Sequence, residues 1–406
     1  MAAEIQSDSY NSGTVRKKPY LLNKLEGCDS TINAAVMIPR EEGVISVSSD
    51  RNLRVWLKRD SGQYWPSICH PMPAIPTSLS YNMETRRLFV GMENGTISEF
   101  SLSEDYNRIS HQRDYLAHQS NVTQVHFVLP CEWVLSCGRD KYFTWHCSET
   151  GRRLGGFQAN SWCTALDFDI QTKHAFIGDL SGAITVLKVD NNDYVYITTL
   201  KGHSGSIRCL AWDPVKRLLC SGSFDQLVIV WDIGGQKGTA FELQGHHQKV
   251  TGLSYATGTQ QLFSAAEDCI IITWDMTLQR NETPDWLDSD TCQKCGEPFF
   301  WNVKDMWDRK TIGVRQHHCR KCGRAVCDKC SAHRSRLPLL GHEFEVRVCD
   351  DCVRSLSEDD KKSHALFHDA RHHVVCMNLD ETTGRLVTAG TDSVIKIWDV
   401  SHMVNP

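Results

Sequence analysis

The sequence predicts an all-β protein: a seven-bladed β-propeller that carries a small two-zinc finger as an insertion. Three observations lead to this fold class. Three segments, 200–235, 243–277 and 366–400, can be laid over one another as copies of one repeat. Short β-branched runs end at a regular spacing along the rest of the chain. Finally, eight of the 18 cysteines fall in one window, between positions 292 and 352, and all eight form Cys-x-x-Cys pairs.

The repeat has a period of just over 40 residues. Each of the three copies reads as short β-branched runs separated by turn residues, and each ends in Trp-Asp. Counting four fainter copies upstream, the seven ends are Trp56, Phe100, Trp145, Leu187, Trp231, Trp274 and Trp398. The intervals are 44, 45, 42, 44, 43 and 124 residues, so the last holds one period plus 81 residues. The repeat resembles the WD repeat, a four-stranded propeller blade of about 40–45 residues.

This resemblance predicts how the ring is divided and closed. One blade cannot bury both of its faces, so blades stack radially. In WD repeats, the strand after the Trp-Asp completes the blade, and the seventh repeat stops with little chain left. We therefore expect 19–25 to be the closing strand, within a first propeller segment 19–280. Residues 363–402 supply the seventh repeat, with 363–369 as the outer strand of blade six, and 1–18 form a disordered tail.

Histidine, serine, aspartate and tryptophan recur at matching places in several repeats, which is typical of a buried hydrogen-bond tetrad. The three sets are His118, Ser136, Asp140 and Trp145; His203, Ser221, Asp225 and Trp231; and His246, Ser264, Asp268 and Trp274. Such groups satisfy one another inside a blade. A Ser-His-Asp set repeated in three blades indicates scaffolding rather than three catalytic triads.

The cysteine cluster lies in residues 284–358, which we call the finger. Its pairs are Cys292/Cys295, Cys319/Cys322, Cys327/Cys330 and Cys349/Cys352. Zinc prefers four soft ligands in tetrahedral geometry, and a Cys-x-x-Cys turn supplies two of them. Eight cysteines therefore predict two closed, structural zinc sites; eight buried free thiols are the alternative. Since the segment has too small a core to fold alone, zinc binding supplies its folding energy.

Basic residues crowd the middle of the finger. Residues 310–336 hold eight Lys or Arg against one acid, Asp328. Arg315, His317, His318 and Arg320 bracket the ligand Cys319, and such a fixed cluster suits phosphate. Ile312 and Val314 place an apolar tip beside these bases, which suits insertion into an anionic bilayer. A merely solvated basic face is the alternative.

The finger resembles the FYVE zinc fingers, which bind phosphatidylinositol 3-phosphate on endosomal membranes. The chain has "RQHHCR" at 315–320 and "RVC" at 347–349, where the family has Arg-(Arg/Lys)-His-His-Cys-Arg and Arg-Val-Cys. The resemblance implies that the lipid phosphates contact Arg315, His317, His318, Arg320 and Arg347. It also implies two cross-braced zinc ions, one on Cys292, Cys295, Cys327 and Cys330, the other on Cys319, Cys322, Cys349 and Cys352.

The finger departs from the family pattern in two places. Gln316 replaces the second basic residue, and Trp286 is not followed by an aspartate three positions on. Asp288 or Asp290 takes that aspartate's role, which in the family is to bind ring hydroxyls of the headgroup. The linker between the first two cysteine pairs is long and contains the aromatic residues Phe299, Phe300, Trp301 and Trp307. We expect these side chains to pack within the finger. A second contact with the membrane is the alternative.

Taken together, the chain resembles the WD-repeat and FYVE-domain proteins of early endosomes. The resemblance implies a non-enzymatic adaptor, cytoplasmic and peripheral on early endosomes, whose propeller binds protein partners, including protein kinases. We expect the finger to protrude from a hairpin loop on one face of the ring. The formal net charge of -5 argues against nucleic acid as a partner. The N-terminus lacks the apolar core of a signal peptide, and no apolar run reaches the roughly 20 residues of a spanning helix.

Two other readings use the same residues. A RING-type ubiquitin ligase also has eight cross-braced ligands, but it usually includes a histidine ligand and lacks a basic His-His-Cys-Arg core. The second alternative is a scaffold that binds only proteins, with a finger that does not bind lipid. Gln316 and the altered tryptophan motif are the reasons to consider it.

Overall fold

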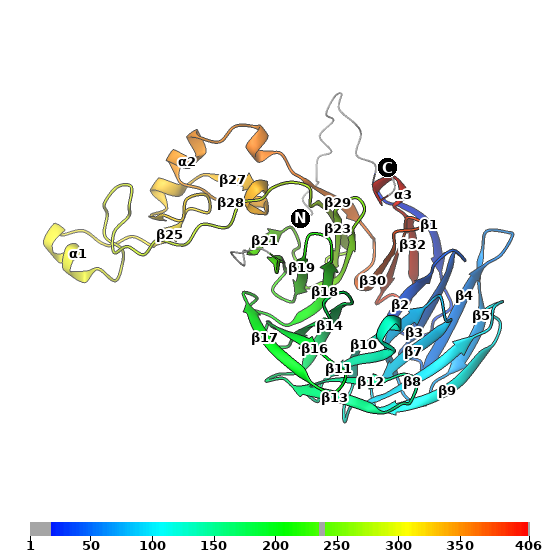
Figure 1. Cartoon of the computed structure of the whole chain (residues 1–406). Coiled ribbons are helices and arrows are strands. Elements are labelled where there is room, and N and C mark those ends of the chain that lie inside the picture. Colours follow the sequence, from blue (N-terminus) through cyan, green and yellow to red (C-terminus); the bar gives the residue numbers. More distant parts are fainter. Residues whose placement is uncertain (1–17, 235–239, 405–406) are drawn as a thin grey trace.

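The computed structural model, which describes residues 18–234 and 240–404, is a ring of seven blades with a finger on its outer side (Figure 1). Each blade is an antiparallel sheet of four propeller strands. This confirms the predicted fold class, a seven-bladed propeller with an inserted two-zinc finger. Of the predicted disordered tail, residues 1–17 lie outside the described residues.

Blades one to four are each built from consecutive strands. Blade one contains β2 (Ile32–Ile38), β3 (Gly43–Ser48), β4 (Asn52–Lys58) and β5 (Tyr64–Pro71). Blade two contains β6 (Pro76–Asn82), β7 (Arg87–Met92), β8 (Thr96–Leu102) and β9 (Ile109–Leu116). Blade three contains β10 (Val122–Val128), β11 (Trp133–Gly138), β12 (Tyr142–Cys147) and β13 (Arg153–Gln158). Blade four contains β14 (Cys163–Asp169), β15 (His174–Asp179), β16 (Ala183–Val189) and β17 (Tyr194–Lys201).

Blade five also consists of consecutive strands: β18 (Ile207–Asp213), β19 (Leu218–Ser223), β20 (Leu227–Asp232) and β21 (Ala240–Gln244).

Blades six and seven are each completed by a strand from elsewhere in the chain. Blade six contains β22 (Val250–Ala256), β23 (Gln261–Ala266), β24 (Ile270–Asp275) and, after the finger, β29 (Ala365–Asp369). Blade seven contains β30 (Val374–Asp380), β31 (Arg385–Gly390), β32 (Ile395–Asp399) and the N-terminal β1 (Tyr20–Leu25). Because β1 pairs with β32, the two ends of the chain close the ring.

Every inner strand has a bulge at the same point, and in five of the seven blades the side chain at the bulge bonds to the next blade. In β10 the register shifts between Val122 and Gln124, and the bulged Thr123 donates its hydroxyl to the Cys163 carbonyl oxygen of the next blade (2.8 Å). Equivalent side-chain bonds to the next blade come from Asn33, Thr77, Thr164 and Thr251. These bonds surround the central channel and fix the blades relative to one another.

The predicted tetrads form in blades five and six. His203 contacts Asp225 (2.9 Å) and Ser221 (2.8 Å), and the Trp231 indole donates to the Ser221 hydroxyl (2.9 Å). His246, Ser264, Asp268 and Trp274 repeat this geometry. The prediction is wrong for one member in blade three, because the Trp145 indole donates to the backbone at Asp190 (3.1 Å) instead of Ser136.

Blade seven contains a tetrad that the sequence reading missed. His372 contacts the Thr388 hydroxyl (2.9 Å) and Asp392 (3.4 Å), and the Trp398 indole donates to the same hydroxyl (2.9 Å). Threonine takes the place of serine here and supplies the same oxygen, so a pattern that admitted either hydroxyl would have found it.

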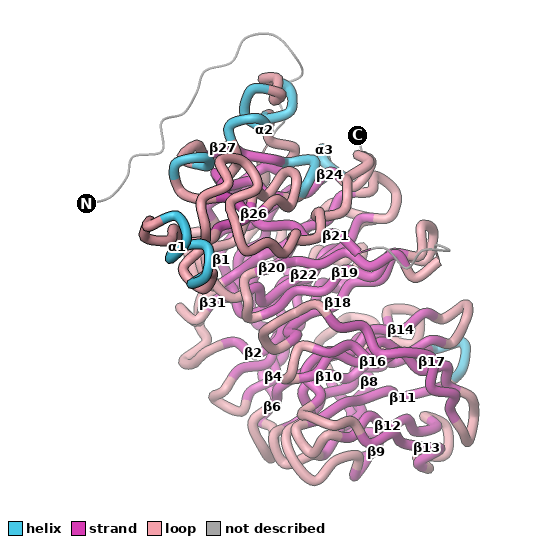
Figure 2. The backbone as a smooth tube through the Cα atoms, turned by 90° about the vertical axis from the view of Figure 1, so that its left-hand side faces the viewer, coloured by secondary structure: helices cyan, strands magenta, loops and turns pink. Residues whose placement is uncertain are grey.

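The finger is a set of short elements held close to blade five. They are α1 (Val303–Arg309), β25 (His317–His318), β26 (Ala325–Val326), β27 (Arg334–Leu337), β28 (His342–Arg347) and α2 (Asp350–Arg354), with 3-10 turns at Lys329–Ser331, Pro338–Leu340 and Asp359–Lys361. Viewed from the side in Figure 2, these elements lie against one part of the ring. A short helix α3 (Ser401–Val404) ends the described chain.

The finger is docked laterally rather than projecting freely from one face. Strand β28 pairs with β21 at Gln244 and His342, so β27 and β28 extend the sheet of blade five. The backbone amide of Gln244 donates to the Gly341 carbonyl oxygen (2.8 Å). The rings of His247 and Phe344 stack with centroids 4.0 Å apart. The finger thus emerges between the paired strands β24 and β29, as expected of a hairpin loop, and in addition attaches along the outer strand of blade five.

Candidate zinc centres and anion-binding surface

The eight cysteine sulfurs of the finger gather into two groups of four. One group is Cys292, Cys295, Cys327 and Cys330; the other is Cys319, Cys322, Cys349 and Cys352. Within each group the sulfurs lie within 4.8 Å of one another. Tetrahedral zinc with Zn–S bonds of about 2.3 Å separates its sulfurs by about 3.8 Å. The Cys295–Cys327 and Cys322–Cys349 sulfur separations of 3.7 and 4.0 Å fit that geometry, so each group holds one structural zinc ion.

In the first two Cys-x-x-Cys pairs, the first cysteine is prepared as a thiolate. Burial by itself raises the pKa of Cys292, but backbone N–H groups, including those of Cys295 and Cys327, outweigh it and lower the pKa to about 7. The pKa of Cys319 is lowered by the same balance, with the Cys349 amide donating to its sulfur (3.3 Å). A thiolate is the form that binds zinc. With four sulfurs and no open position, both centres are structural.

The zinc ligands also set the backbone of the basic cluster. His317 and His318 form β25, which pairs with β26 immediately before the ligand Cys327. The Arg320 amide donates to the Arg347 carbonyl oxygen (3.0 Å), which brings "RQHHCR" and "RVC" side by side. Burial first, and then the positive charge of Arg347, lower the pKa of His317, while Asp328 opposes them. The structure therefore brings together His317, Arg320 and Arg347, with Arg315 exposed beside them.

Trp286 supports one side of this cluster. Its indole stacks on the His318 ring with centroids 4.8 Å apart and planes 10° from parallel. The Arg320 guanidinium carbon lies 4.6 Å from the centre of the same indole. One exposed tryptophan thus holds an imidazole and a guanidinium in place through ring stacking and a cation–π contact.

The two candidate aspartates differ in what they contact. Asp290 accepts a hydrogen bond from the Trp301 indole (3.0 Å), and its carbonyl oxygen accepts the Phe299 amide (2.9 Å). Asp290 therefore helps to fold the linker. Asp288 is exposed too, but among the described residues its carboxylate has no hydrogen bond or ion pair.

The tip of the finger exposes apolar side chains. Helix α1 is capped by Asn302, whose side chain accepts the Asp305 backbone amide (3.2 Å), and it ends before Lys310, which adopts a left-handed conformation. Beside it Ile312 is 87% exposed. Val314, in contrast, is half-buried against the core of the finger, and its amide donates to the Pro298 carbonyl oxygen (2.9 Å).

The linker aromatics pack less than expected. Phe299 is fully buried, as predicted, but Phe300, Trp301 and Trp307 are exposed, and Trp307 is 82% exposed. The expectation of structural packing is therefore wrong for Trp307. In Figure 1, α1 lies at the end of the finger farthest from the propeller. Within the described residues, no helix is long and apolar enough to cross a membrane.

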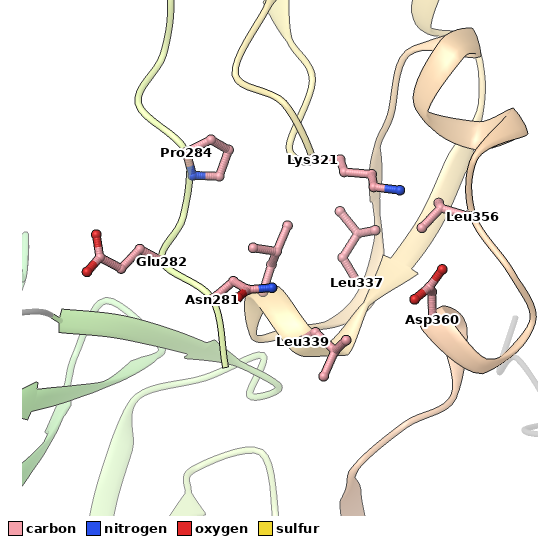
Figure 3. Close-up of a pocket in the computed structure, with 9 residues that line it drawn as sticks. Asn281, Glu282, Pro284, Lys321, Leu337, Leu339, Leu356 and Asp360 are labelled. Carbon is pink, nitrogen blue, oxygen red and sulfur yellow. The ribbon is translucent and has the colours of Figure 1, made fainter. Parts of the chain in front are cut away.

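A pocket of about 310 Å³ lies where the chain enters the finger (Figure 3). Its lining includes Leu337, Leu339 and Leu356, with Lys321 and Asp360 among the polar residues. Lys321 donates to the Ser355 hydroxyl (3.0 Å). Although Lys321 follows Arg320 directly, it belongs to this pocket and not to the basic cluster.

Comparison with known proteins gives the same division of the chain. The FYVE zinc finger model matches residues 284–358, and the WD domain, G-beta repeat model matches 194–232, 238–275 and 362–399. In solved structures, the WD40 β-propeller domain of Doa1 aligns with a TM-score of 0.60 at 16% identity, covering 94% of this chain and 96% of that one. That likeness concerns the fold.

Full-length relatives share both parts. WD repeat and FYVE domain-containing protein 2 of Homo sapiens is 56% identical over 405 residues, covering 100% of both chains. WD repeat and FYVE domain-containing protein 1 of Mus musculus is 52% identical over 404 residues, covering 100% of this chain and 97% of the relative. With a zinc finger of this pattern inserted in a propeller of this period, the chain belongs to the family of WD repeat and FYVE domain-containing proteins.

Proposed function

We propose that this protein is a non-enzymatic adaptor that binds phosphatidylinositol 3-phosphate on early endosomes and presents its propeller to protein partners. The observation that carries the proposal is the cluster of His317, His318, Arg320 and Arg347 on a backbone that two zinc centres hold in place. Fixed guanidinium and imidazole groups bind phosphate through charge-assisted hydrogen bonds with little loss of side-chain freedom. A FYVE finger implies phosphoinositide binding. We propose in addition that the lipid is phosphorylated at the 3-position and that the membrane is that of the early endosome.

The headgroup residues take separate roles. Arg315, His317, His318, Arg320 and Arg347 bind the phosphate oxygens, and Asp288 binds ring hydroxyls. Trp286 holds His318 and Arg320. Gln316 offers an amide where a second cation would add charge, so the affinity of one finger is modest and other contacts with the membrane have to add to it.

The exposed tip supplies those contacts. Ile312 and Trp307 enter the interfacial region of the bilayer, while Val314 stays in the finger core and supports the loop from below. Lys304 and Lys310 flank them and favour an anionic surface. The protein is then cytoplasmic and peripheral, on membranes that display phosphatidylinositol 3-phosphate.

The propeller is the protein-binding part. A WD propeller implies protein interactions. Its repeated His, Ser and Asp side chains hydrogen-bond to one another within the blades and therefore serve the fold. We propose endosomal trafficking or signalling proteins, including protein kinases, as partners, and no nucleic acid.

The test is co-sedimentation of the full zinc-loaded chain with liposomes that contain or lack phosphatidylinositol 3-phosphate, alongside Arg320→Ala. We expect lipid-dependent binding by the wild type and a loss of at least about tenfold in the variant, since a charge-assisted bond contributes about 1.5–3 kcal/mol. Arg217→Ala on the propeller is the matched control. No binding by the wild type would overturn the proposal and favour the protein-only scaffold; ubiquitin discharge from an E2 would favour a RING-type ligase.

A further inference from the structure

One carboxylate lies inside the basic cluster. Asp328 Oδ1 accepts a hydrogen bond from a terminal nitrogen of Arg347 (2.7 Å) and lies 3.3 Å from Nε2 of His317. In sequence it is the one acid among residues 310–336. Two residues assigned above to the phosphate thus already share an anion supplied by the chain itself.

Among the described residues, the Asp328 side chain has no other partner that explains its place. It precedes the short turn Lys329–Ser331, yet its side chain makes no capping hydrogen bond there. Its carboxylate is 70% exposed, and among the described residues its partners are His317 and Arg347. Its backbone is held between the zinc ligands Cys327 and Cys330, while the side chain faces solvent and can rotate away.

The cations, in contrast, are held independently of Asp328. The same Arg347 nitrogen donates to the Ser331 carbonyl oxygen (3.1 Å) and hydroxyl (3.0 Å), and the Arg347 carbonyl oxygen accepts the Arg320 amide. The backbone of His317 is held by pairing with Val326. If the Asp328 carboxylate moved aside, the Arg347 side chain and the His317 backbone would keep these other bonds.

We propose that the Asp328 carboxylate occupies the position of a phosphate oxygen between Arg347 and His317, and thereby competes with the phosphate and weakens its binding. This inference rests on the proposed function, because it concerns the same site. A carboxylate and a phosphate monoester offer the same acceptors to an arginine, but the phosphate carries more charge and more oxygens. The headgroup therefore displaces Asp328, and each binding event loses the free energy of the internal pair.

The expected change in phosphate affinity follows from the solvent exposure of the Asp328 carboxylate. An exposed ion pair contributes up to about 1 kcal/mol, and removing a negative charge from the rim of the site also removes its repulsion of phosphate. We expect Asp328→Asn, which keeps the shape of the side chain, to raise the affinity about three- to tenfold. Asp328→Glu keeps the charge and serves as the matched control, with an affinity within about twofold of the wild type.

The experiment is isothermal titration of the full zinc-loaded chain with dihexanoyl phosphatidylinositol 3-phosphate and, separately, with inorganic phosphate at a fixed neutral pH. The soluble lipid omits the bilayer, so membrane insertion does not contribute. A gain for Asp328→Asn with both probes assigns the competition to the phosphate itself; a gain with the lipid alone assigns it to the placed headgroup. Either result supports the proposal.

Two outcomes would overturn it. Equal affinities of the wild type and Asp328→Asn would mean that the internal pair does not compete. A lower affinity in Asp328→Asn would make Asp328 a positioning residue for Arg347. In both cases the wild type still binds the lipid, so the proposed function survives, whereas a failure of every form to bind either probe removes both.

Discussion

Single residues decide which parts of the repeated pattern hold and which change. Ser136 retains its contact with His118 (2.9 Å), yet Trp145 in the same blade donates elsewhere. In the finger, Asp290 is used to hold Trp301, which leaves Asp288 exposed for a ligand. In each case the residue type matches the pattern, and the neighbours determine its use.

Buried histidines make the stability of the propeller depend on pH. Burial first, and then the positive charge of Lys396, lower the pKa of His372 to about 4, while Asp392 opposes them. In the unfolded chain the pKa of histidine is about 6.5. Between these values the unfolded state binds more protons, so stability falls as the pH falls from about 6.5 to 4, by up to about 1.4 kcal/mol per pH unit.

We therefore expect His372→Gln to lose less stability than the wild type between about pH 7.5 and pH 5, although the variant is less stable at neutral pH because its tetrad is weakened. Urea unfolding of both proteins at the two pH values measures the difference. An equal loss of stability in the two proteins would contradict the assignment to His372.

At the scale of elements, the finger depends on short segments between zinc ligands. Gly313 illustrates this. A side chain there would overlap Met306 and the backbone of Phe300, and the Gly313 amide donates to the Met306 sulfur (2.9 Å). This close approach ties the loop to α1, and Ile312 in the loop and Trp307 in the helix are both exposed.

Trp307→Ala should weaken binding to phosphatidylinositol 3-phosphate liposomes by at least about tenfold, because a tryptophan carries about 150–250 Å² of surface and partial burial of it contributes more than about 1.4 kcal/mol. Its affinity for the soluble dihexanoyl lipid should not change, since among the described residues the Trp307 side chain has no hydrogen bond or ring contact with the residues proposed to bind the headgroup. Trp65→Ala, which removes an exposed tryptophan from blade one, is the control. Unchanged liposome binding by Trp307→Ala would exclude α1 from the membrane contact.

At the scale of the whole molecule, the finger and the ring form one continuous sheet at blade five. Because β28 pairs with β21, the finger has a fixed orientation relative to the ring, with α1 at its outer end. The orientation of the finger on a membrane then also sets the orientation of the propeller toward its partners.

Gly341 tests this attachment. Its φ of 79° is left-handed, and a Cβ there would overlap the Glu242 carbonyl oxygen of the propeller. We expect Gly341→Ala to detach β28 from β21, which raises hydrogen exchange at Gln244 and increases the radius of gyration in solution scattering, while soluble-lipid affinity is kept. Gly296→Ala shares the left-handed φ, at 77°, but a Cβ there reaches no propeller atom. Equal behaviour of the two variants would show that backbone strain, not the docking contact, is responsible.

The sequence by itself determined the number of blades, the zinc ligands and the basic cluster. These properties are local or periodic: a blade repeats its pattern every 42 to 45 residues, and a Cys-x-x-Cys turn supplies two zinc ligands from one short segment. Only the tertiary structure decided that the finger lies along blade five, that Asp328 reaches Arg347 and His317, and that Trp307 is uncovered. Each of these depends on which surfaces meet across long separations in the chain, and contacts of that kind leave no period or spacing in the sequence.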